Sequence, residues 1–254
     1  MRAWNRIAAG VAASCFTVVI GATSAGAAEI ALVTTGAVEH IMLGLIPSFE
    51  QVSGHKVHMN VYGTALAVSK VKEGEAADIV LLSPEALGDL AKADKVGAAS
   101  ITPVFRSRVG LAVRAGAPRP DIGSAEALKK TLLDAKSIGY SIGPSGEFFS
   151  TVLIDRLGIA DALKPKMKQV RGAPVATAIA KGDVEVGIHQ VAELMPIPGI
   201  ELVGALPPEL NTTILYATGI STNGKTPDAA TALAKAVMLQ SAVPVIRKNG
   251  MEPF

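Results

Sequence analysis

Small hydroxyl residues and glycines recur in this sequence where a short apolar run gives way to a helical pattern. The positions that share this context are Thr34, Thr35, Gly63, Thr64 and Ser83 in the first half of the chain and Ser145, Gly146, Arg171, Gly172 and Gln190 in the second. Loops of this kind present free backbone N–H groups at the positive end of a helix, which is how proteins hold an anion without a countercharge. Arg171 would add a bidentate grip on a carboxylate or a phosphate-like group. The pattern predicts a binding site for a small anion.

Capping is the alternative explanation of the same residues. Serine, threonine and glycine are ordinary residues of helix caps and turns, so any one of these loops could be explained in that way. The recurrence of the pattern at most strand ends, in both halves of the chain, favours a shared anion site.

Two further titratable side chains accompany these loops. Glu147 follows Gly146, and His189 precedes Gln190. A carboxylate and an imidazole can remove and return a proton, so these residues are the expected acid and base if the protein is an enzyme. A histidine at a strand end is also commonly a hydrogen-bonded structural residue, and this alternative stays open for His189.

Motifs for several other chemistries do not occur in the sequence. It contains no GxGxxG or HExxH pattern, which argues against a dinucleotide site and a zinc-protease centre. The single cysteine, Cys15, lies in a predicted leader, so the mature chain offers no thiolate ligand or cysteine nucleophile. We expect neither a cofactor nor a metal.

Strand-like and helix-like segments alternate along the chain. Apolar or alternating runs predict strands at residues 30–33, 57–61, 79–82, 109–113, 138–142, 184–188 and 212–217. Helical spacing and capping residues predict helices that begin near Val38, Leu66, Pro84, Ser124, Phe148, Pro174 and Thr226. This order predicts an α/β fold with mostly parallel sheets. Ligands of such sheets bind outside the carboxyl ends of the strands, where the hydroxyl and glycine loops fall.

The expected molecule is a hinged clamp of two lobes with its ligand in the cleft. Two short strands, 108–115 and 212–219, lie where the chain could pass between lobes, and no linker composition separates an N-terminal from a C-terminal domain. If both strands are crossings, lobe I is formed by residues 28–108 and 215–254, and lobe II by residues 109–214.

The first 27 residues are typical of a secretory signal peptide. Arg2 and Arg6 form a positive region, an apolar run extends from Ile7 to Ile20, and Ala25-Gly26-Ala27 offers a cleavage site after Ala27. A membrane anchor or a lipoprotein cleaved before Cys15 would be the alternatives. The leader predicts a periplasmic protein.

The charge balance and the low aromatic content indicate what kind of ligand the protein binds. Lys and Arg number 24 against 22 Asp and Glu, and the loss of Arg2 and Arg6 with the leader would leave 22 of each. A chain with no excess positive charge and 4% aromatic residues is unlike a nucleic-acid binder. We expect a monomer that binds a small anionic ligand and no nucleic acid.

The order of these motifs resembles that of a known family. The motifs are Thr34-Thr35-Gly36, Gly63-Thr64-Ala65-Leu66, Ala77–Ser83, Pro144-Ser145-Gly146, Val170-Arg171-Gly172 and Gly187-Ile188. Following a leader, they are similar to the molybdate-binding, ModA-like branch of type II periplasmic solute-binding proteins, over the whole mature chain. The resemblance implies two lobes with two crossover strands and a cleft, and a closed form that docks on an ABC permease driven by its ATPase.

The resemblance also implies roles for the loop residues. Family members hold a tetrahedral oxyanion with hydroxyls and backbone amides, at positions that match Thr34 or Thr35, Gly63, Thr64, Ser145 and Val170 to Gly172. Where the family usually has a tyrosine, this sequence has Gln190, preceded by His189. A related branch with glutamine in this loop includes aconitate isomerase, an enzyme on the same scaffold.

Three functions follow from the resemblance. The first is a binding protein of an ABC importer, for a molybdate-like oxyanion or a di- or tricarboxylate. The second is an isomerase that interconverts cis- and trans-aconitate. The third is a sensor subunit, which the sequence does not separate from the first.

Overall fold

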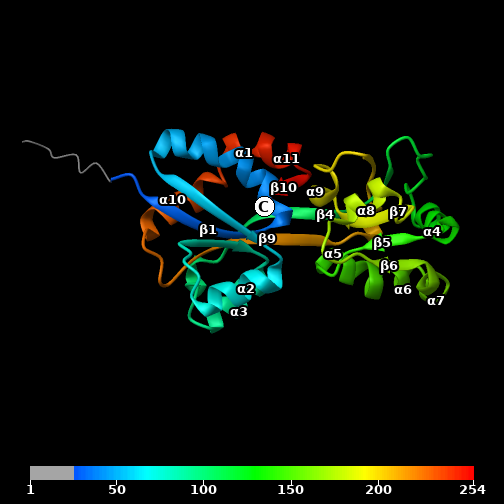
Figure 1. Cartoon of the computed structure of the whole chain (residues 1–254), viewed down its shortest axis with the longest axis horizontal. Coiled ribbons are helices and arrows are strands. Elements are labelled where there is room, and N and C mark those ends of the chain that lie inside the picture. The colour runs from blue at the N-terminus through cyan, green and yellow to red at the C-terminus, as the bar shows by residue number, and fades with distance from the viewer. Residues whose placement is uncertain (1–25) are drawn as a thin grey trace, which may run out of the picture.

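The computed structural model describes residues 26–254, and the predicted leader, residues 1–27 with Cys15, lies almost wholly outside them. The described chain forms two bodies that lie side by side and are joined by long strands (Figure 1). We name the body that contains the first strands lobe I and the other body lobe II.

Lobe I is a sheet with helices on both faces. Its strands lie in the order β2-β1-β3-β9-β4, with β10 also beside β4. Their bounds are β1 Glu29–Thr35, β2 Lys56–Tyr62, β3 Ile79–Leu82, β4 Thr102–Arg114, β9 Thr213–Ile220 and β10 Met251–Pro253. One face carries α1 Gly36–Ser53, α10 Pro227–Ala236 and α11 Val243–Lys248, and the other carries α2 Thr64–Glu73 and α3 Pro84–Lys92 (Figure 1).

Lobe II is built around the second half of β4, which pairs with β7 and β8. The remaining strands are β5 Ile138–Tyr140, β6 Met167–Gln169, β7 Val186–Gln190 and β8 Ile200–Ala205. Its helices are α4 Ala125–Asp134, α5 Pro144–Glu147, a π-helical turn Phe148–Leu153, α6 Ile154–Arg156, α7 Ala160–Leu163, α8 Val175–Lys181 and α9 Val191–Leu194. Short 3-10 turns at Ala98–Ser100, Lys164–Lys166, Pro208–Leu210 and Gln240–Ala242 complete both lobes.

The predicted α/β fold is confirmed, and local chemistry explains several of its element ends. The hydroxyl of Ser83 accepts a hydrogen bond from the backbone N–H of Ala86 (3.3 Å), which caps α3. Ser124 caps α4 in the same way through Ala127 (3.2 Å). Gly182 ends α8 in the left-handed conformation (φ 81°), which favours glycine.

The prediction of mostly parallel sheets is wrong for the strands that join the lobes. β1 runs parallel to β2 and β3, and β5 runs parallel to β6 and β7. β4 and β9 are antiparallel to the strands with which they pair. The prediction assumed that a helix connects each strand to the next, as it does between parallel strands. β4 and β9 run between the lobes without such a connection, so the alternation of strand-like and helix-like segments did not reveal their direction.

The chain passes between the lobes at two adjacent places. Residues 102–108 of β4 pair with β9 of lobe I, and residues 109–113 pair with β7 of lobe II. The second passage comes just before β9, whose residues 213–220 pair with β3 and β4 of lobe I. The side chain of Asn211 joins the two passages, because it accepts a hydrogen bond from the Val109 N–H (3.0 Å) and donates one to the Val109 carbonyl (2.9 Å).

Asp78 is a buried carboxylate that holds lobe I together. It is 5% exposed, and it accepts hydrogen bonds from the backbone N–H of Ala31 (2.8 Å) and of Thr226 (2.9 Å). These bonds tie the start of β3 to β1 and to the beginning of α10.

We expect Asp78→Ala to lower the free energy of unfolding by about 3 kcal/mol, because two partly buried N–H groups would lose their acceptor. Urea denaturation measures the change. Asp89→Ala is the matched control, since Asp89 is exposed and forms a surface ion pair with Lys92 (3.0 Å). That variant should stay within about 1 kcal/mol of wild type. Equal effects of the two substitutions would contradict the role given to Asp78.

No single helix within residues 26–254 is long and apolar enough to cross a bilayer. Residues 227–236 and 240–248 meet the length and composition of a span only when they are taken together, as a pair bent by 62°.

Candidate functional site

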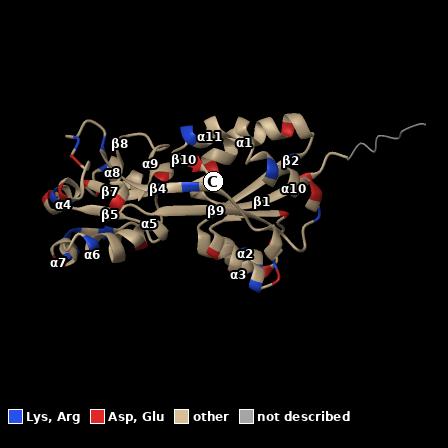
Figure 2. Cartoon of the chain, turned by 180° about the vertical axis from the view of Figure 1, so that it is seen from behind, with Lys and Arg blue, Asp and Glu red and all other residues tan. Residues whose placement is uncertain are grey.

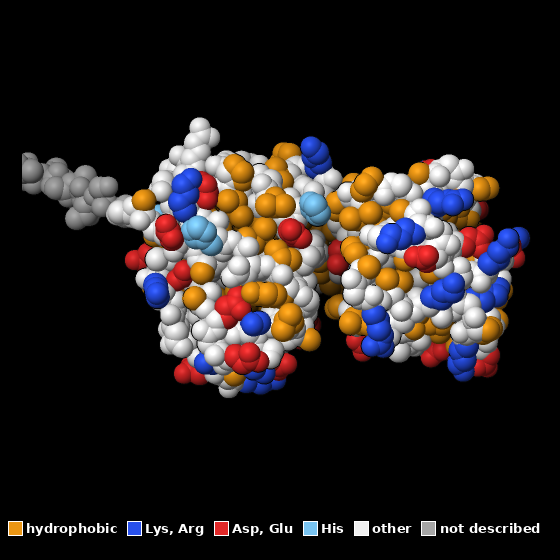
Figure 3. All heavy atoms as spheres, viewed as in Figure 1, with side chains coloured by type: hydrophobic (Ala, Val, Ile, Leu, Met, Phe, Trp, Pro, Cys, Tyr) orange, Lys and Arg blue, Asp and Glu red, His pale blue; other side chains and the backbone are white. Residues whose placement is uncertain are grey.

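A cavity of about 490 Å³ lies between the two lobes. Figure 3 shows the groove that separates the two bodies at the surface. The lobe I wall of the cavity consists of Thr35, Gly36, Val61, Tyr62 and Gly63, and the lobe II wall of Ser141, Ile142, residues 170–175, His189 and Glu193. The volume falls within the range of about 300–1,000 Å³ that is typical of small-molecule sites. We call this cavity the cleft.

Parallel pairing brings the lobe I residues of the cleft together. Thr35 lies opposite Tyr62 at the carboxyl ends of β1 and β2. The helices that follow therefore begin side by side, with Gly36 as the first residue of α1 and Gly63 as the N-cap of α2. The Thr35 side chain makes no capping hydrogen bond. The first backbone N–H groups of α1 are therefore not occupied by a capping side chain. This wall can donate hydrogen bonds to an anion.

The lobe II wall forms where three parallel strands end. Tyr140 of β5 lies opposite Gln169 of β6 and Ile188 of β7, so the loops that follow these residues meet at one sheet edge. Gly172 adopts a left-handed conformation (φ 72°), which turns the loop after β6 back toward the cleft. Arg171 in this loop is exposed, and its guanidinium donates to the side-chain oxygen of Gln169. A cation thus stands on the cleft wall.

His189 and Glu193 form a pair on the same wall. The Nδ1 atom of His189 lies 3.1 Å from Oε2 of Glu193, four residues farther along the chain at the start of α9. Nδ1 also accepts a hydrogen bond from the backbone N–H of Gln190 (2.8 Å). His189 is 7% exposed, and the Glu193 side chain is 30% exposed. Because Nδ1 already contacts Gln190 and Glu193, Nε2 is the imidazole nitrogen that remains for a ligand.

Gln190 lies behind the cleft wall, where its side chain joins the lobes. It is 2% exposed, its Oε1 accepts a hydrogen bond from the hydroxyl of Tyr216 (2.9 Å), and its Nε2 donates to Oε2 of Glu193 (2.9 Å). Burial raises the pKa of the Tyr216 phenol well above its usual range, and the Glu193 carboxylate raises it further, so the phenol stays a donor. Gln190 therefore links Glu193 of lobe II to Tyr216 on β9 of lobe I.

Ser145 and Gly146 support the cleft from behind Ser141. Both are buried, and the hydroxyl of Ser145 lies 3.5 Å from that of Ser141. A Cβ atom on Gly146 would lie 1.8 Å from the carbonyl oxygen of Ser141. Glycine is therefore required at position 146 by close approach of two backbone segments, and this contact sets the position of a residue that lines the cleft.

Several other residues predicted for the site have different partners. The hydroxyl of Thr34 donates to the carbonyl of Leu81 (2.9 Å), and Ser83 caps α3. Thr64 is the first residue of α2 but is not part of the cleft lining, and Glu147 lies exposed on α5 outside it. The predicted residues that the structure brings together in the cleft lining are Thr35, Gly63, Arg171, Gly172 and His189.

Three polar side chains of the cleft, Tyr62, Ser141 and Glu193, are not among the predicted ligand-binding residues. Tyr62 and Ser141 follow the same rule as the predicted residues, because each lies at or just after the end of a strand. Glu193 carried a weaker signal, its spacing of four residues from His189 at the start of a helix. Among residues 26–254, no three His, Cys, Asp or Glu side chains gather closely enough to hold a metal ion.

We expect Gln190→Leu to lower the free energy of unfolding by about 2 kcal/mol, because the buried Tyr216 hydroxyl and the Glu193 carboxylate would each lose a partner. Chemical denaturation measures the loss. Gln51→Leu, at an exposed position on α1, is the control and should change stability by less than about 0.5 kcal/mol. If Gln190→Leu behaved like this control, the buried link between the lobes would not stabilise the fold.

Comparison with known proteins agrees with this architecture. A curated aconitate isomerase from Pseudomonas sp is 29% identical over 227 residues, which cover 87% of each chain. The substrate-binding domain of a putative molybdenum ABC transporter from Clostridium difficile superposes with a TM-score of 0.73 at 15% identity, covering 90% of this chain and all of that one. The periplasmic molybdate-binding protein of Azotobacter vinelandii superposes with a TM-score of 0.72 at 16% identity, over 87% and 98% of the two chains.

The predicted type II periplasmic-binding-protein fold is confirmed by these superpositions. The family described as bacterial extracellular solute-binding protein matches residues 30–252, from the first strand of lobe I to its last. With a match of that extent, this chain belongs to the bacterial extracellular solute-binding proteins.

Proposed function

We propose that this protein binds a small polycarboxylate, such as a di- or tricarboxylate, in the cleft between its lobes. The observation that carries the proposal is that Arg171 and the His189–Glu193 pair line the same cavity. Arg171 offers a charge-assisted bond to one carboxylate, and the amides at Gly36, Gly63 and Gly172 offer donors to it or to another.

The Glu193 carboxylate favours a polycarboxylate over a bare tetrahedral oxyanion. A compact dianion in the cleft would lie close to this like charge, which costs free energy at short range. A polycarboxylate spreads its charges along a carbon skeleton. It can place one end at Arg171 and the helix N-termini while a carbon or a protonated carboxyl group faces His189 and Glu193.

The family and the predicted leader support a proposed cellular role. In this proposal the protein is secreted to the periplasm through its signal peptide and acts there as a monomer. It delivers its ligand to an ABC permease and its ATPase in the inner membrane. A fold neighbour is described as the substrate-binding domain of a putative molybdenum ABC transporter, which supports a transport role.

A second candidate function is the interconversion of cis- and trans-aconitate, and two observations favour it. The relative at 29% identity is an aconitate isomerase, and the cleft holds an imidazole and a carboxylate in contact. In this function His189 takes the tautomer with its proton on Nδ1, which donates to Glu193 in place of accepting from the Gln190 N–H. Nε2 then removes a proton from the CH₂ carbon, the double bond moves by one carbon, and the proton returns to the former alkene carbon. Glu193 stabilises the imidazolium through Nδ1–H. Glu147, the acid–base partner predicted from the sequence, lies outside the cleft lining.

A thermal-shift panel tests the binding proposal. The anions are citrate, tricarballylate, both aconitates, molybdate, tungstate, sulfate and phosphate. A ligand at 100 times its Kd stabilises the native state by about 2.7 kcal/mol, so a polycarboxylate should raise the Tm more than any inorganic oxyanion. Stabilisation by molybdate or sulfate alone would overturn the polycarboxylate proposal. Proton NMR of either aconitate incubated with the protein tests the second function separately.

A further inference from the structure

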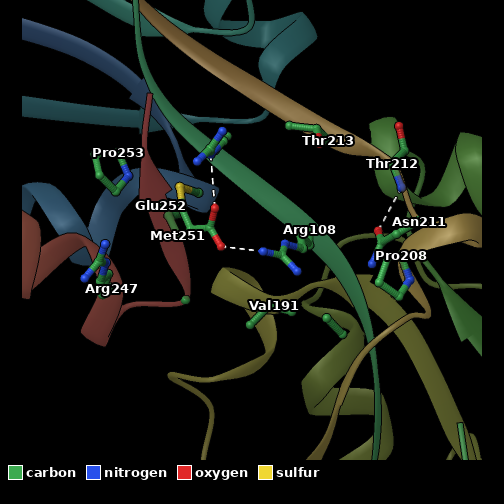
Figure 4. A pocket seen from close by; sticks show the side chains of 13 residues that line it. Arg108, Val191, Pro208, Asn211, Thr212, Thr213, Arg247, Met251, Glu252 and Pro253 are labelled. Carbon is green, nitrogen blue, oxygen red and sulfur yellow. Dashed lines mark hydrogen bonds and ion pairs between the residues drawn. The ribbon is translucent and has the colours of Figure 1, made fainter. Parts of the chain in front are cut away.

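A second and larger cavity, of about 910 Å³, lies where the chain passes between the lobes. It shares no lining residue with the cleft. Its walls come from β4, from α11 and β10 of lobe I, and from α9 and residues 205–213 (Figure 4). We call it the hinge cavity.

Arginine dominates the charge of the hinge cavity. Arg106 and Arg108 on β4 and Arg247 on α11 line it, against the single carboxylate of Glu252 on β10. Two of the three guanidinium groups share that carboxylate: Nε of Arg106 lies 3.1 Å from Oε2, and Nη2 of Arg108 lies 2.6 Å from Oε1. Figure 2 shows the basic segment of β4 beside the C-terminal strand. The lining therefore carries two positive charges in excess.

Arg247 is the cation that this arrangement leaves without a countercharge. Within residues 26–254, the carboxylate of Glu252 contacts Arg106 and Arg108, and no ion pair of Arg247 is formed. Each guanidinium carries five N–H donors, so Arg106 and Arg108 also keep donors beyond those used for Glu252. Figure 4 shows Arg108, Glu252 and Arg247 around the same space.

The segment beside Arg108 is fixed in place and adds hydroxyl groups, since Thr213 pairs with Arg108 across β4 and β9. Asn211 is hydrogen-bonded through its side chain to both backbone groups of Val109, which anchors the segment that carries Thr212 and Thr213. Both threonines line the cavity, as does apolar surface from Val191 and Met251. The lining of the hinge cavity thus combines arginine cations, threonine hydroxyls and a small apolar surface.

We propose that the hinge cavity is a second binding site, for an oxyanion with two or more negative charges. Arg247 provides the unpaired charge, Arg106 and Arg108 provide further donors, and Thr212 and Thr213 provide hydroxyls. The ligand chemistry is shared by inorganic phosphate, by sulfate and by a short polycarboxylate. Because the walls come from both lobes, an anion bound there favours one arrangement of the lobes over others.

Titration of the full mature chain with inorganic phosphate tests this site. Calorimetry gives Kd, and hydrogen exchange followed by mass spectrometry locates the bound anion. We expect protection in peptides that cover residues 205–213 and 247–253, and a Kd at least about tenfold weaker in Arg247→Gln, as expected for loss of one charge-assisted bond. Lys248→Gln is the matched control, because it removes the same charge from the next exposed residue of α11.

The outcomes separate the hinge cavity from the cleft. Wild-type Kd in Lys248→Gln with weakened binding in Arg247→Gln supports the proposal. Equal Kd values in the two variants would overturn it, as would protection confined to residues 34–37 and 170–175 of the cleft. Parallel titrations with sulfate and citrate assign the ligand to inorganic oxyanions or polycarboxylates. If none of the three anions protects the hinge peptides, the cavity is not an anion site.

Discussion

Replacement of Arg171 by glutamine is expected to weaken the binding of a tricarboxylate by about ten- to a hundredfold. Arg171 is the arginine of the cleft lining, and a charge-assisted bond of this kind contributes about 1.5–3 kcal/mol. The substitution should leave the free energy of unfolding near the wild-type value, because the side chain is exposed. Calorimetric titration with trans-aconitate measures the change in Kd.

Arg156→Gln is the matched control for this prediction, since Arg156 is an exposed arginine of lobe II outside the cleft lining. It should bind trans-aconitate as the wild type does. A bare oxyanion held by amides and hydroxyls would depend far less on Arg171. Equal affinities of the Arg171 and Arg156 variants for trans-aconitate would therefore show that Arg171 does not contact the ligand.

Replacement of His189 by glutamine has the largest expected effect if the protein is an isomerase. Loss of a positioned general base lowers turnover by about 10²–10⁴-fold. The variant should still bind aconitate, because Arg171 and the amide donors of the cleft remain in place. Proton NMR measures turnover, and calorimetry measures binding of the same substrate.

His40→Gln is the control for His189→Gln, because His40 is exposed on α1 of lobe I. It should keep wild-type turnover. Wild-type protein that binds aconitate without interconverting its isomers would eliminate the enzyme candidate and leave the binding proposal intact. Turnover that survives in His189→Gln would exclude this histidine as the base.

Much of the cleft could be predicted because its residues obey a rule of position. Thr35, Gly63, Arg171 and Gly172 lie just beyond or at the ends of parallel strands, and such ends meet at one sheet edge. The same rule misplaced Gln190, because all five residues of β7 are buried and its side chain is enclosed between the lobes. The Gln190 side chain is buried because lobe I packs against it, and the sequence of β7 does not reveal that contact.

Other features of the fold depend on contacts between distant residues. The antiparallel course of β4 depends on its pairing with strands far along the chain, β7, β8, β9 and β10. Gly146 was predicted to bind the ligand, whereas the structure gives it a packing role against the carbonyl of Ser141. A glycine in a loop is compatible with either role, and the neighbouring backbone decides between them.

The most direct test of a polycarboxylate bound between the lobes is a titration of ¹⁵N-labelled protein with trans-aconitate, followed by backbone amide signals. We predict that the amide signals of Gly36 and Gly63 in lobe I and of Gly172 in lobe II shift together, with one saturating curve. A response confined to one lobe would contradict the account. So would amide shifts that appear with molybdate but with none of citrate, tricarballylate and the two aconitates.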